Sequence, residues 1–142
     1  MKAKLRIIYL FLILSTYFIQ VHPCLSFQSN SESDSLQSLI KIAFAADGDS
    51  VTSKVSKRAG RAPYYLVFDG NGVFLKSIKN PSHKQGRGAG STVVDLLKEE
   101  SIKTVIAGKF GDKMIKLLET NKIEYHEHRG FVKEILAIFL KK

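Results

Sequence analysis

The sequence predicts an α/β domain built on one mixed sheet, and three observations support this class. Short apolar runs of strand length alternate with longer segments whose apolar residues recur at helical spacing. A glycine-rich turn joins two of the strand-length runs directly, which predicts an antiparallel hairpin. Helical segments separate the later runs, and β-α-β connections of this kind place strands in parallel. The 142 residues, 44% of them hydrophobic, suit one such domain.

The first half of the domain predicts three strands. Residues 39–46 are almost wholly apolar and end at Asp-Gly-Asp over 47–49, which predicts a largely buried strand. Residues 64–68 and 73–78 are the second and third predicted strands. The residues between them, Asp-Gly-Asn-Gly at 69–72, favour a tight turn because glycine and asparagine tolerate positive φ. These two strands should therefore form the hairpin.

The second half of the domain alternates helices and strands. Apolar residues at helical spacing predict helices over residues 91–100, 112–120 and 131–140, each with an apolar face toward the sheet. Short apolar runs predict strands over residues 104–107 and 123–126. The domain thus has five predicted strands and three predicted helices, with right-handed crossovers between its parallel strands.

Charge and cysteine content limit the kind of site that the protein can carry. Lysine and arginine total 22 against 13 acids, a net charge of +9 that favours anionic partners. Cys24 is the single cysteine, so the chain forms no internal disulfide. A zinc ribbon and a four-cysteine iron–sulfur site are excluded for the same reason.

The first 26 residues have the pattern of an export signal peptide. Three basic residues lie in the first six positions, and a mainly apolar run follows over residues 7–21, with no acid before Glu32. The apolar run is short for a membrane-spanning helix. Small residues at Cys24 and Ser26 predict cleavage after Ser26, which leaves no stable membrane span. Two alternatives stay open, namely an uncleaved signal anchor and a lipoprotein acylated at Cys24.

Export would place the mature protein in the periplasm or outside the cell. Cleavage removes three basic residues and no acid, so a net charge of about +6 remains. Residues 27–37 are rich in serine and nearly free of aromatic residues, a composition typical of a solvated linker. The folded domain is therefore expected to occupy residues 38–142.

A basic loop precedes the second predicted strand. Residues 54–61 contain two lysines together with Arg58 and Arg61, and no acid. The loop connects two strands predicted to be buried, so it should lie over an end of the sheet, where loops commonly carry function. A guanidinium group presents a planar fork of donors that suits oxyanions and anionic clusters. The alternative is a solvated basic loop whose glycine only turns the chain.

A glycine-rich loop over residues 80–91 opens directly into a predicted helix. Its Gly86, Gly88 and Gly90 would let backbone N–H groups approach a ligand, while Arg87 adds positive charge. The spacing fits neither a dinucleotide fingerprint nor a P-loop. We therefore expect an anion pocket shared with the basic loop. A flexible loop with Ser91 as the helix cap is the alternative.

Three histidines, His83, His126 and His128, are candidate metal ligands. On an extended chain the last two project to one face, but two ligands without a third make a weak site, and exposed polar surface is the alternative. Asp47 and Asp69 end strands predicted to run in opposite directions, so the carboxylate cluster of a two-metal nuclease is not expected. The chain also lacks the Gly-x-Ser-x-Gly elbow of serine hydrolases. The sequence therefore predicts no enzyme.

Several motifs give the chain a resemblance to a known family. They lie at residues 41–47, 55–65, 80–81, 86–90 and 105–108, and the stretch Gly-Arg-Ala-Pro-Tyr-Tyr is the most specific. In their order and spacing, residues 39–140 resemble the dinitrogenase iron–molybdenum cofactor biosynthesis domain of NifX- and NafY-type carriers and of NifB. The resemblance implies a ribonuclease-H-like fold of five strands, no enzymatic activity, and a role in holding or transferring an iron–sulfur or iron–molybdenum cluster or its precursor.

One departure from the family pattern concerns the basic loop. Many members have a His-Phe pair directly before Gly-Arg-Ala, where this chain has Arg58-Ala59, so the loop offers no imidazole to a metal. The sequence therefore predicts a non-catalytic protein that binds an anionic metallocluster or a similar small anion. The alternative is an interaction module that uses the same basic face for a protein partner or, less favoured, for nucleic acid. Nucleic-acid binding would show a steep salt dependence.

Overall fold

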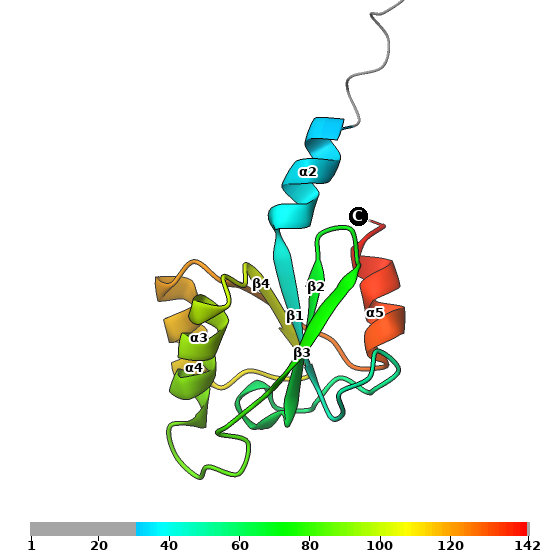
Figure 1. The fold of residues 1–142 in the computed structure, drawn as a ribbon. Coiled ribbons are helices and arrows are strands. Elements are labelled where there is room, and N and C mark those ends of the chain that lie inside the picture. Colours follow the sequence, from blue (N-terminus) through cyan, green and yellow to red (C-terminus); the bar gives the residue numbers. More distant parts are fainter. Residues whose placement is uncertain (1–30, 142) are drawn as a thin grey trace, which may run out of the picture. The chain divides into compact units, whose positions relative to one another are not determined.

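The computed structural model describes residues 31–141, and the domain begins at Asp34. Its strands are β1 (Lys41–Ala46), β2 (Tyr64–Asp69), β3 (Phe74–Lys79), β4 (Thr104–Ala107) and β5 (Glu124–Glu127). Its helices are α2 (Ser31–Leu39), α3 (Ala89–Glu99), α4 (Asp112–Thr120) and α5 (Val132–Phe139), together with one short 3-10 turn, η1 (Ala59–Arg61). All five predicted strands and the three predicted helices are present, which confirms the α/β class (Figure 1).

The five strands form one mixed sheet in the order β3-β2-β1-β4-β5. Strand β2 runs antiparallel to both β1 and β3, so the predicted hairpin is confirmed. Strands β1, β4 and β5 run parallel to one another. This is the mixed five-stranded sheet of the expected ribonuclease-H-like class.

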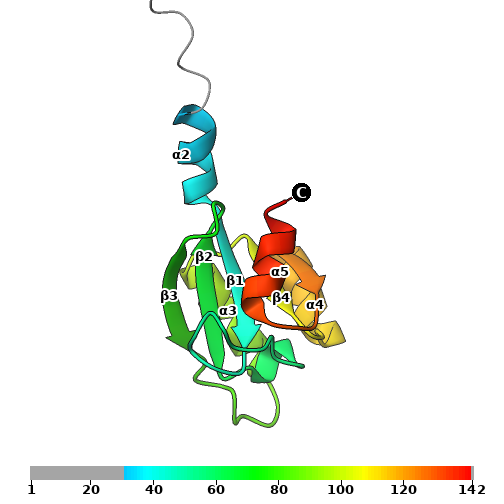
Figure 2. The ribbon, with the colours of Figure 1, turned by 90° about the vertical axis from the view of Figure 1, so that its right-hand side faces the viewer.

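Strand β1 lies at the centre of the sheet and is buried on both faces. Ala43 and Ala45 belong to the core cluster that includes α3 and α4 side chains, whereas Ile42 and Phe44 belong to the cluster on the α5 side. Figures 1 and 2 show the same layers, with α3 and α4 on one face of the sheet and α5 on the other. A strand covered on both faces carries an unbroken apolar run, as the sequence of β1 does.

The N-terminal helix α2 overlaps the segment that the sequence predicts as a linker, residues 27–37. The structure is helical from Ser31 to Leu39. Residues 35–40 are nevertheless exposed, as expected from their polar composition. The predicted signal peptide over residues 1–26 lies outside the described residues. Within the described part of the chain, no helix has the length and apolarity needed to cross a membrane.

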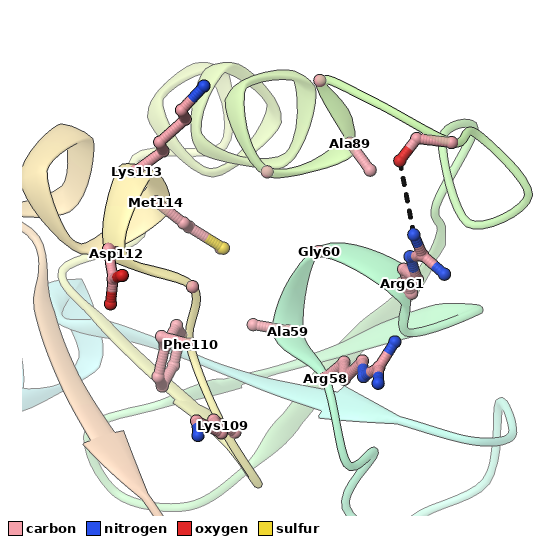
Figure 3. A pocket seen from close by; sticks show the side chains of 14 residues that line it. Arg58, Ala59, Gly60, Arg61, Ala89, Lys109, Phe110, Asp112, Lys113 and Met114 are labelled. Atoms are coloured by element: carbon pink, nitrogen blue, oxygen red, sulfur yellow. Dashed lines mark hydrogen bonds between the residues drawn. The ribbon is translucent and has the colours of Figure 1, made fainter.

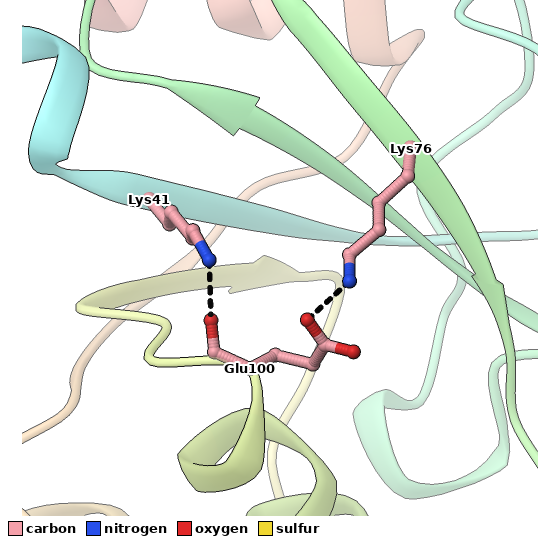
Figure 4. A network of polar contacts seen from close by, with 3 residues as sticks. All are labelled: Lys41, Lys76 and Glu100. Atoms are coloured by element: carbon pink, nitrogen blue, oxygen red, sulfur yellow. Dashed lines mark hydrogen bonds and ion pairs between the residues drawn. The ribbon is translucent and has the colours of Figure 1, made fainter.

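Three charged groups connect the sheet to the end of α3 (Figure 4). Lys76 of β3 forms an ion pair with the carboxylate of Glu100, and the ammonium of Lys41 donates to the backbone carbonyl of Glu100 at 3.1 Å. Both lysines lie at the negative end of the α3 dipole, where cations are favourable. The Lys76–Glu100 pair is partly exposed, so its contribution to stability is small.

Helices α3 and α4 end in the same backbone motif. After α3, the Ile102 N–H donates to the Leu97 carbonyl and the Ser101 N–H donates to the Lys98 carbonyl, both at 2.9 Å. This pair of bonds defines a Schellman motif, which places its C′ residue in the left-handed region. Ser101 accordingly has φ 58°, and Lys122 has φ 56° in the equivalent position after α4. Glycine is the residue favoured there, so both side chains introduce strain.

Replacing Ser101 by glycine should therefore stabilise the domain. We expect Ser101→Gly to raise the free energy of unfolding by about 0.5–1 kcal/mol, because the left-handed penalty of a side chain exceeds the entropic cost of glycine. Urea denaturation followed by circular dichroism measures this change. Ser101→Ala keeps the Cβ atom and should give no gain. An equal midpoint for the glycine and alanine variants would contradict the strain argument.

Candidate functional site

A pocket of about 540 Å³ opens at the edge of the sheet where the parallel strands end (Figure 3). Three segments that are distant in the sequence form it: the turn η1, the glycine-rich loop that leads into α3, and the loop that joins β4 to α4. Its lining residues are Arg58, Ala59, Gly60, Arg61, Gly86, Gly88, Ala89, Gly90, Lys109, Phe110, Gly111, Asp112, Lys113 and Met114.

The sheet topology explains why the pocket lies at this edge. Strands β1 and β4 are parallel neighbours, but the chain leaves β1 toward β2 and β3 before it returns through α3 to β4. The chain thus leaves β1 toward one side of the sheet and β4 toward β5 on the other side, and both loops begin at the same carboxyl edge. Open sheets bind ligands in the crevice formed at such a change of direction.

The buried side chain of Asn80 fixes two of the three pocket segments. Its amide nitrogen donates to the carbonyls of Gly60 at 3.3 Å and Ala62 at 2.8 Å, which holds η1. Its amide oxygen accepts from the N–H and the hydroxyl of Ser82, at 2.9 Å and 2.8 Å. The Ser82 hydroxyl also lies 3.3 Å from the Ala89 carbonyl at the start of α3. One buried amide therefore sets the separation between η1 and the glycine-rich loop.

A buried tyrosine supports η1 from beneath. The Tyr65 hydroxyl donates to the Ala59 carbonyl at 2.5 Å, and the Tyr65 side chain is fully buried in β2. Burial raises the pKa of this phenol far above its ordinary value, so the hydroxyl remains a neutral donor. Beside it, the Ala59 N–H donates to the Lys109 carbonyl at 3.0 Å, which connects η1 to the loop after β4.

Two glycines allow the pocket segments to approach one another closely. A Cβ atom on Gly60 would lie 3.2 Å from the Gly90 nitrogen, so η1 packs directly on the first turn of α3. A Cβ atom on Gly108 would lie 2.9 Å from the Lys57 Cα atom. The Gly108 N–H also donates to the Ser56 carbonyl at 2.8 Å. The basic loop and the loop after β4 thus pack backbone against backbone, which requires glycine.

The pocket is electropositive. Arg58, Arg61, Lys109 and Lys113 contribute four cationic side chains, and Asp112 is the one acid among the described lining residues. Helices α3 and α4 both begin at the pocket, and neither N-cap makes a side-chain hydrogen bond. The first N–H groups of a helix have no partner within the helix, and they attract anions. Charged side chains and two helix ends therefore act on the same space.

One wall of the pocket is apolar and contains a sulfur atom. Met114 and Phe110 are buried almost completely, and Figure 3 shows the Met114 thioether directed toward the space between α4 and η1. A Cβ atom on Gly90 would lie 3.2 Å from the Met114 Cβ atom, so this wall is closely packed. Of the described residues that line the pocket, none is a cysteine or a histidine.

The structure brings together most of the residues expected to bind an anion. Arg58, Arg61, Gly86, Gly88 and Gly90 all line the pocket, and the Arg61 guanidinium donates to the Gly86 carbonyl at 3.3 Å. Arg87 lies in the same loop and is exposed, but it is not among the lining residues.

The three candidate metal ligands belong to no three-residue metal-binding group among the described residues. His83 contacts the Asn80 carbonyl at 3.1 Å, and the His126 ring packs edge-on against Phe139 on the α5 side of the sheet. His128 is exposed just after β5. Among residues 31–141, no three side chains of histidine, cysteine, aspartate or glutamate form a group that could hold a metal ion. Metal binding by any one of these histidines stays a prediction.

The loop after β4 is the part of the site that the sequence prediction missed. Lys109, Phe110, Asp112, Lys113 and Met114 all line the pocket. The sequence could have indicated this loop, because Gly108 and Lys109 directly follow the predicted strand over residues 104–107. Loops at the carboxyl ends of neighbouring parallel strands lie side by side. The N-terminal position of Lys113 in α4 was a second, weaker signal.

Comparisons with known proteins agree with this fold. A family model described as dinitrogenase iron-molybdenum cofactor matches residues 39–142. The apo form of the orange protein from Desulfovibrio gigas is 25% identical, with a TM-score of 0.67 over 71% of this chain and 87% of that one. No curated protein matches the sequence.

Two further solved structures share the fold. A putative NifB protein from Thermotoga is 24% identical, with a TM-score of 0.63 over 72% of this chain and 88% of its own. The protein PH0822 is 20% identical, with a TM-score of 0.61 over 72% of this chain and 90% of its own. At these identities the likeness shows a common fold and nothing more.

Because Asn80 makes these buried hydrogen bonds, removing its side chain should strongly lower the stability of the domain. We expect Asn80→Ala to lower the free energy of unfolding by about 2–4 kcal/mol, because the buried carbonyls and the Ser82 hydroxyl lose their partners. Amide hydrogen exchange should also become faster in residues 59–62 and 86–90. Asn71→Ala, at an exposed turn position, is the matched control and should change neither quantity. Unchanged exchange in both segments of the Asn80 variant would show that Asn80 does not fix the pocket.

Proposed function

Because the chain belongs to the dinitrogenase iron–molybdenum cofactor family, we propose that it is a non-catalytic binding protein for an anionic metal–sulfur cluster or the precursor of one. The cluster is cargo, held in the pocket formed by η1, the glycine-rich loop and the loop after β4. The electropositive character of this pocket is the observation that carries the proposal. Four cationic side chains and two uncapped helix N-termini surround the same space, opposed by Asp112 alone among the described lining residues.

The donor set fits a cluster that carries its own ligands. Iron and molybdenum in proteins commonly bind thiolate or imidazole ligands, and the described lining residues supply neither. Guanidinium and ammonium groups instead bind the negative charge of sulfide or oxide atoms at the cluster surface. Met114 and Phe110 add a polarisable wall that suits sulfur-rich surfaces. We therefore propose that charge and packing hold the cargo, and that protein–metal bonds do not.

The second candidate function uses the same basic face for a macromolecular partner, either an exported protein or a nucleic acid. Exposed Arg87, at the rim of the glycine-rich loop, is the observation in its favour, since it adds charge outside the pocket itself. Such binding would weaken steeply with salt and show little preference among small anions. Because the site is a concave pocket with an apolar wall, we favour binding of a small anionic cluster over binding of a macromolecular partner.

Cluster binding predicts a metal content that depends on the pocket arginines. The protein, isolated anaerobically from its own cells, should contain iron in stoichiometric amount, with or without molybdenum, by elemental analysis. Arg58→Glu/Arg61→Glu should lose this metal. Its affinity for tetrathiomolybdate, measured by calorimetric titration, should fall by about tenfold or more per arginine, because each charge-assisted hydrogen bond contributes roughly 1.5–3 kcal/mol.

A control variant separates the pocket from the overall charge. Lys103→Glu/Lys116→Glu changes the net charge by the same amount at two exposed positions outside the pocket. This variant should keep its metal and its affinity. A wild-type protein that is free of metal and also fails to bind tetrathiomolybdate would overturn the cluster proposal and favour the macromolecular partner.

We also propose that the protein works outside the cytoplasm, from the export signal pattern of residues 1–26. Cell fractionation with mass spectrometry should find it in the periplasm or the medium, shortened by cleavage after Ser26. Leu10→Arg/Leu12→Arg interrupts the apolar run and should retain the full-length chain in the cytoplasm. A full-length product bound to the membrane would support the uncleaved signal anchor. A lipid attached to Cys24 would support the lipoprotein. Wild-type protein found full-length in the cytoplasm would contradict export.

A further inference from the structure

The peptide group between Lys109 and Phe110, in the loop after β4, is held by hydrogen bonds on both sides. Its carbonyl, which belongs to Lys109, accepts from the Ala59 N–H of η1 at 3.0 Å. Its N–H, which belongs to Phe110, donates to the Glu127 carboxylate at the end of β5, also at 3.0 Å. The carbonyl and the N–H of a trans peptide point in opposite directions. This one peptide group therefore connects η1 to β5 across the edge of the pocket, and Figure 3 shows Lys109 and Phe110 beside Ala59.

The Glu127 carboxylate has no other described partner that would determine its position. Within residues 31–141 it accepts one hydrogen bond, from the Phe110 N–H, and the one ion pair there is that of Lys76 with Glu100. Phe110 itself is almost completely buried, and a polar group of a buried residue that loses its partner costs free energy. An ionised acceptor also makes a stronger hydrogen bond than a neutral one. The carboxylate therefore determines the direction of the Phe110 N–H.

A second side chain of β5 contacts Phe110 in a different way. Tyr125 and Glu127 are two positions apart in the strand, so their side chains lie on the same face. The Tyr125 ring packs edge-on against the Phe110 ring, with the ring centroids 5.5 Å apart. This ring contact keeps the Phe110 side chain in the core, whereas the hydrogen bond orients its backbone. Removing the carboxylate should therefore leave the hydrophobic packing in place.

The held peptide group directly precedes a part of the pocket that attracts anions. Phe110 lies two residues before α4, and the Ile115 N–H donates to the Gly111 carbonyl at 3.0 Å as the helix begins. The N–H groups before Ile115 have no partner within the helix, and they attract negative charge. Lys109 and Lys113, on either side of this helix start, line the pocket. The orientation of the held peptide group therefore sets the direction in which the helix start faces.

We propose that Glu127 is a positioning residue of the pocket, which orients the loop after β4 so that Lys109 and the first turn of α4 face the bound anion. This inference rests on the proposed function, because it takes an anion as the occupant of the pocket. Glu127 is not among the lining residues, and it acts through the Phe110 backbone. Its own negative charge repels an anion, so its geometric role and its charge predict opposite effects of its removal on binding.

Two substitutions separate the geometric role of Glu127 from its charge. Glu127→Ala removes both the acceptor and the charge, and should weaken binding of tetrathiomolybdate about fivefold or more, because the loop is no longer ordered before the anion arrives. Glu127→Gln removes the charge but keeps a side-chain oxygen that accepts from the Phe110 N–H, so it should bind at least as tightly as the wild type. Calorimetric titration at one salt concentration measures both changes.

A matched control removes the same charge from the same strand. Glu124 is exposed at the start of β5, and Glu124→Ala should not weaken binding. Unchanged or tighter binding by Glu127→Ala would overturn the positioning role. Equal losses in Glu127→Ala and Glu127→Gln would also overturn it, because the acceptor oxygen would then not be what matters.

Amide hydrogen exchange, followed residue by residue by NMR, tests the positioning without a ligand. In Glu127→Ala the amides of Phe110 and Ala59 should both exchange about tenfold faster, because the peptide group between them loses its fixed orientation. Glu127→Gln should keep both rates. The amides of β1 are the internal reference and should not change, since a general loss of stability would make them exchange faster as well.

The exchange rates also distinguish failure of this proposal from failure of the proposed function. Faster exchange of Phe110 alone, with Ala59 unchanged, would show a local hydrogen bond and overturn the positioning role. A wild-type protein that does not bind tetrathiomolybdate would count against cluster binding. In that case the exchange of Phe110 and Ala59 decides by itself whether Glu127 orients the loop.

Discussion

The burial of strand β1 on both faces is the constraint on which the rest of the structure depends. A strand in this position must be apolar along its whole length, must pair on both edges, and must be covered by helices on two sides. Strand β2 pairs antiparallel with one edge through the hairpin, and β4 pairs parallel with the other. The parallel pairing requires a crossover, which α3 supplies, and the crossover brings the start of α3 to the carboxyl edge beside the loops after β1 and β4. The pocket is thus a consequence of how the centre of the sheet is built.

The pocket depends on backbone positions as much as on side chains. Asn80 and Tyr65 hold η1 in place by hydrogen bonds to carbonyl groups, and Gly60 and Gly108 let neighbouring segments pack without a side chain between them. This arrangement fixes the N-termini of two helices and the nearby cations before any ligand arrives. Preorganised donors of this kind bind an anion without the cost of reordering the loops. In our proposal the cargo carries its own metal ligands, because the described lining residues include neither cysteine nor histidine.

The two edges of the sheet have different chemistry. The carboxyl edge is concave, basic and rich in glycine, whereas the amino edge presents leucine, isoleucine, valine and phenylalanine to solvent. Antiparallel and parallel strands in one sheet produce this separation, because the β2–β3 turn lies at the amino edge and the loops after β1 and β4 lie at the carboxyl edge.

The sequence by itself determined the elements of this protein, since hydrophobic period and turn chemistry are local properties that each segment carries. It also determined the basic loop and the glycine-rich loop, whose composition is visible without a fold. It did not determine α2, because a serine-rich segment has little apolar pattern, and the contact of the helix with Gly70 comes from the distant β2–β3 turn. Only the tertiary structure decided that Lys109, Lys113 and Met114 share a pocket with Arg58. Residues from different loops become neighbours through strand order, and strand order is a property of the whole sheet that no single segment encodes.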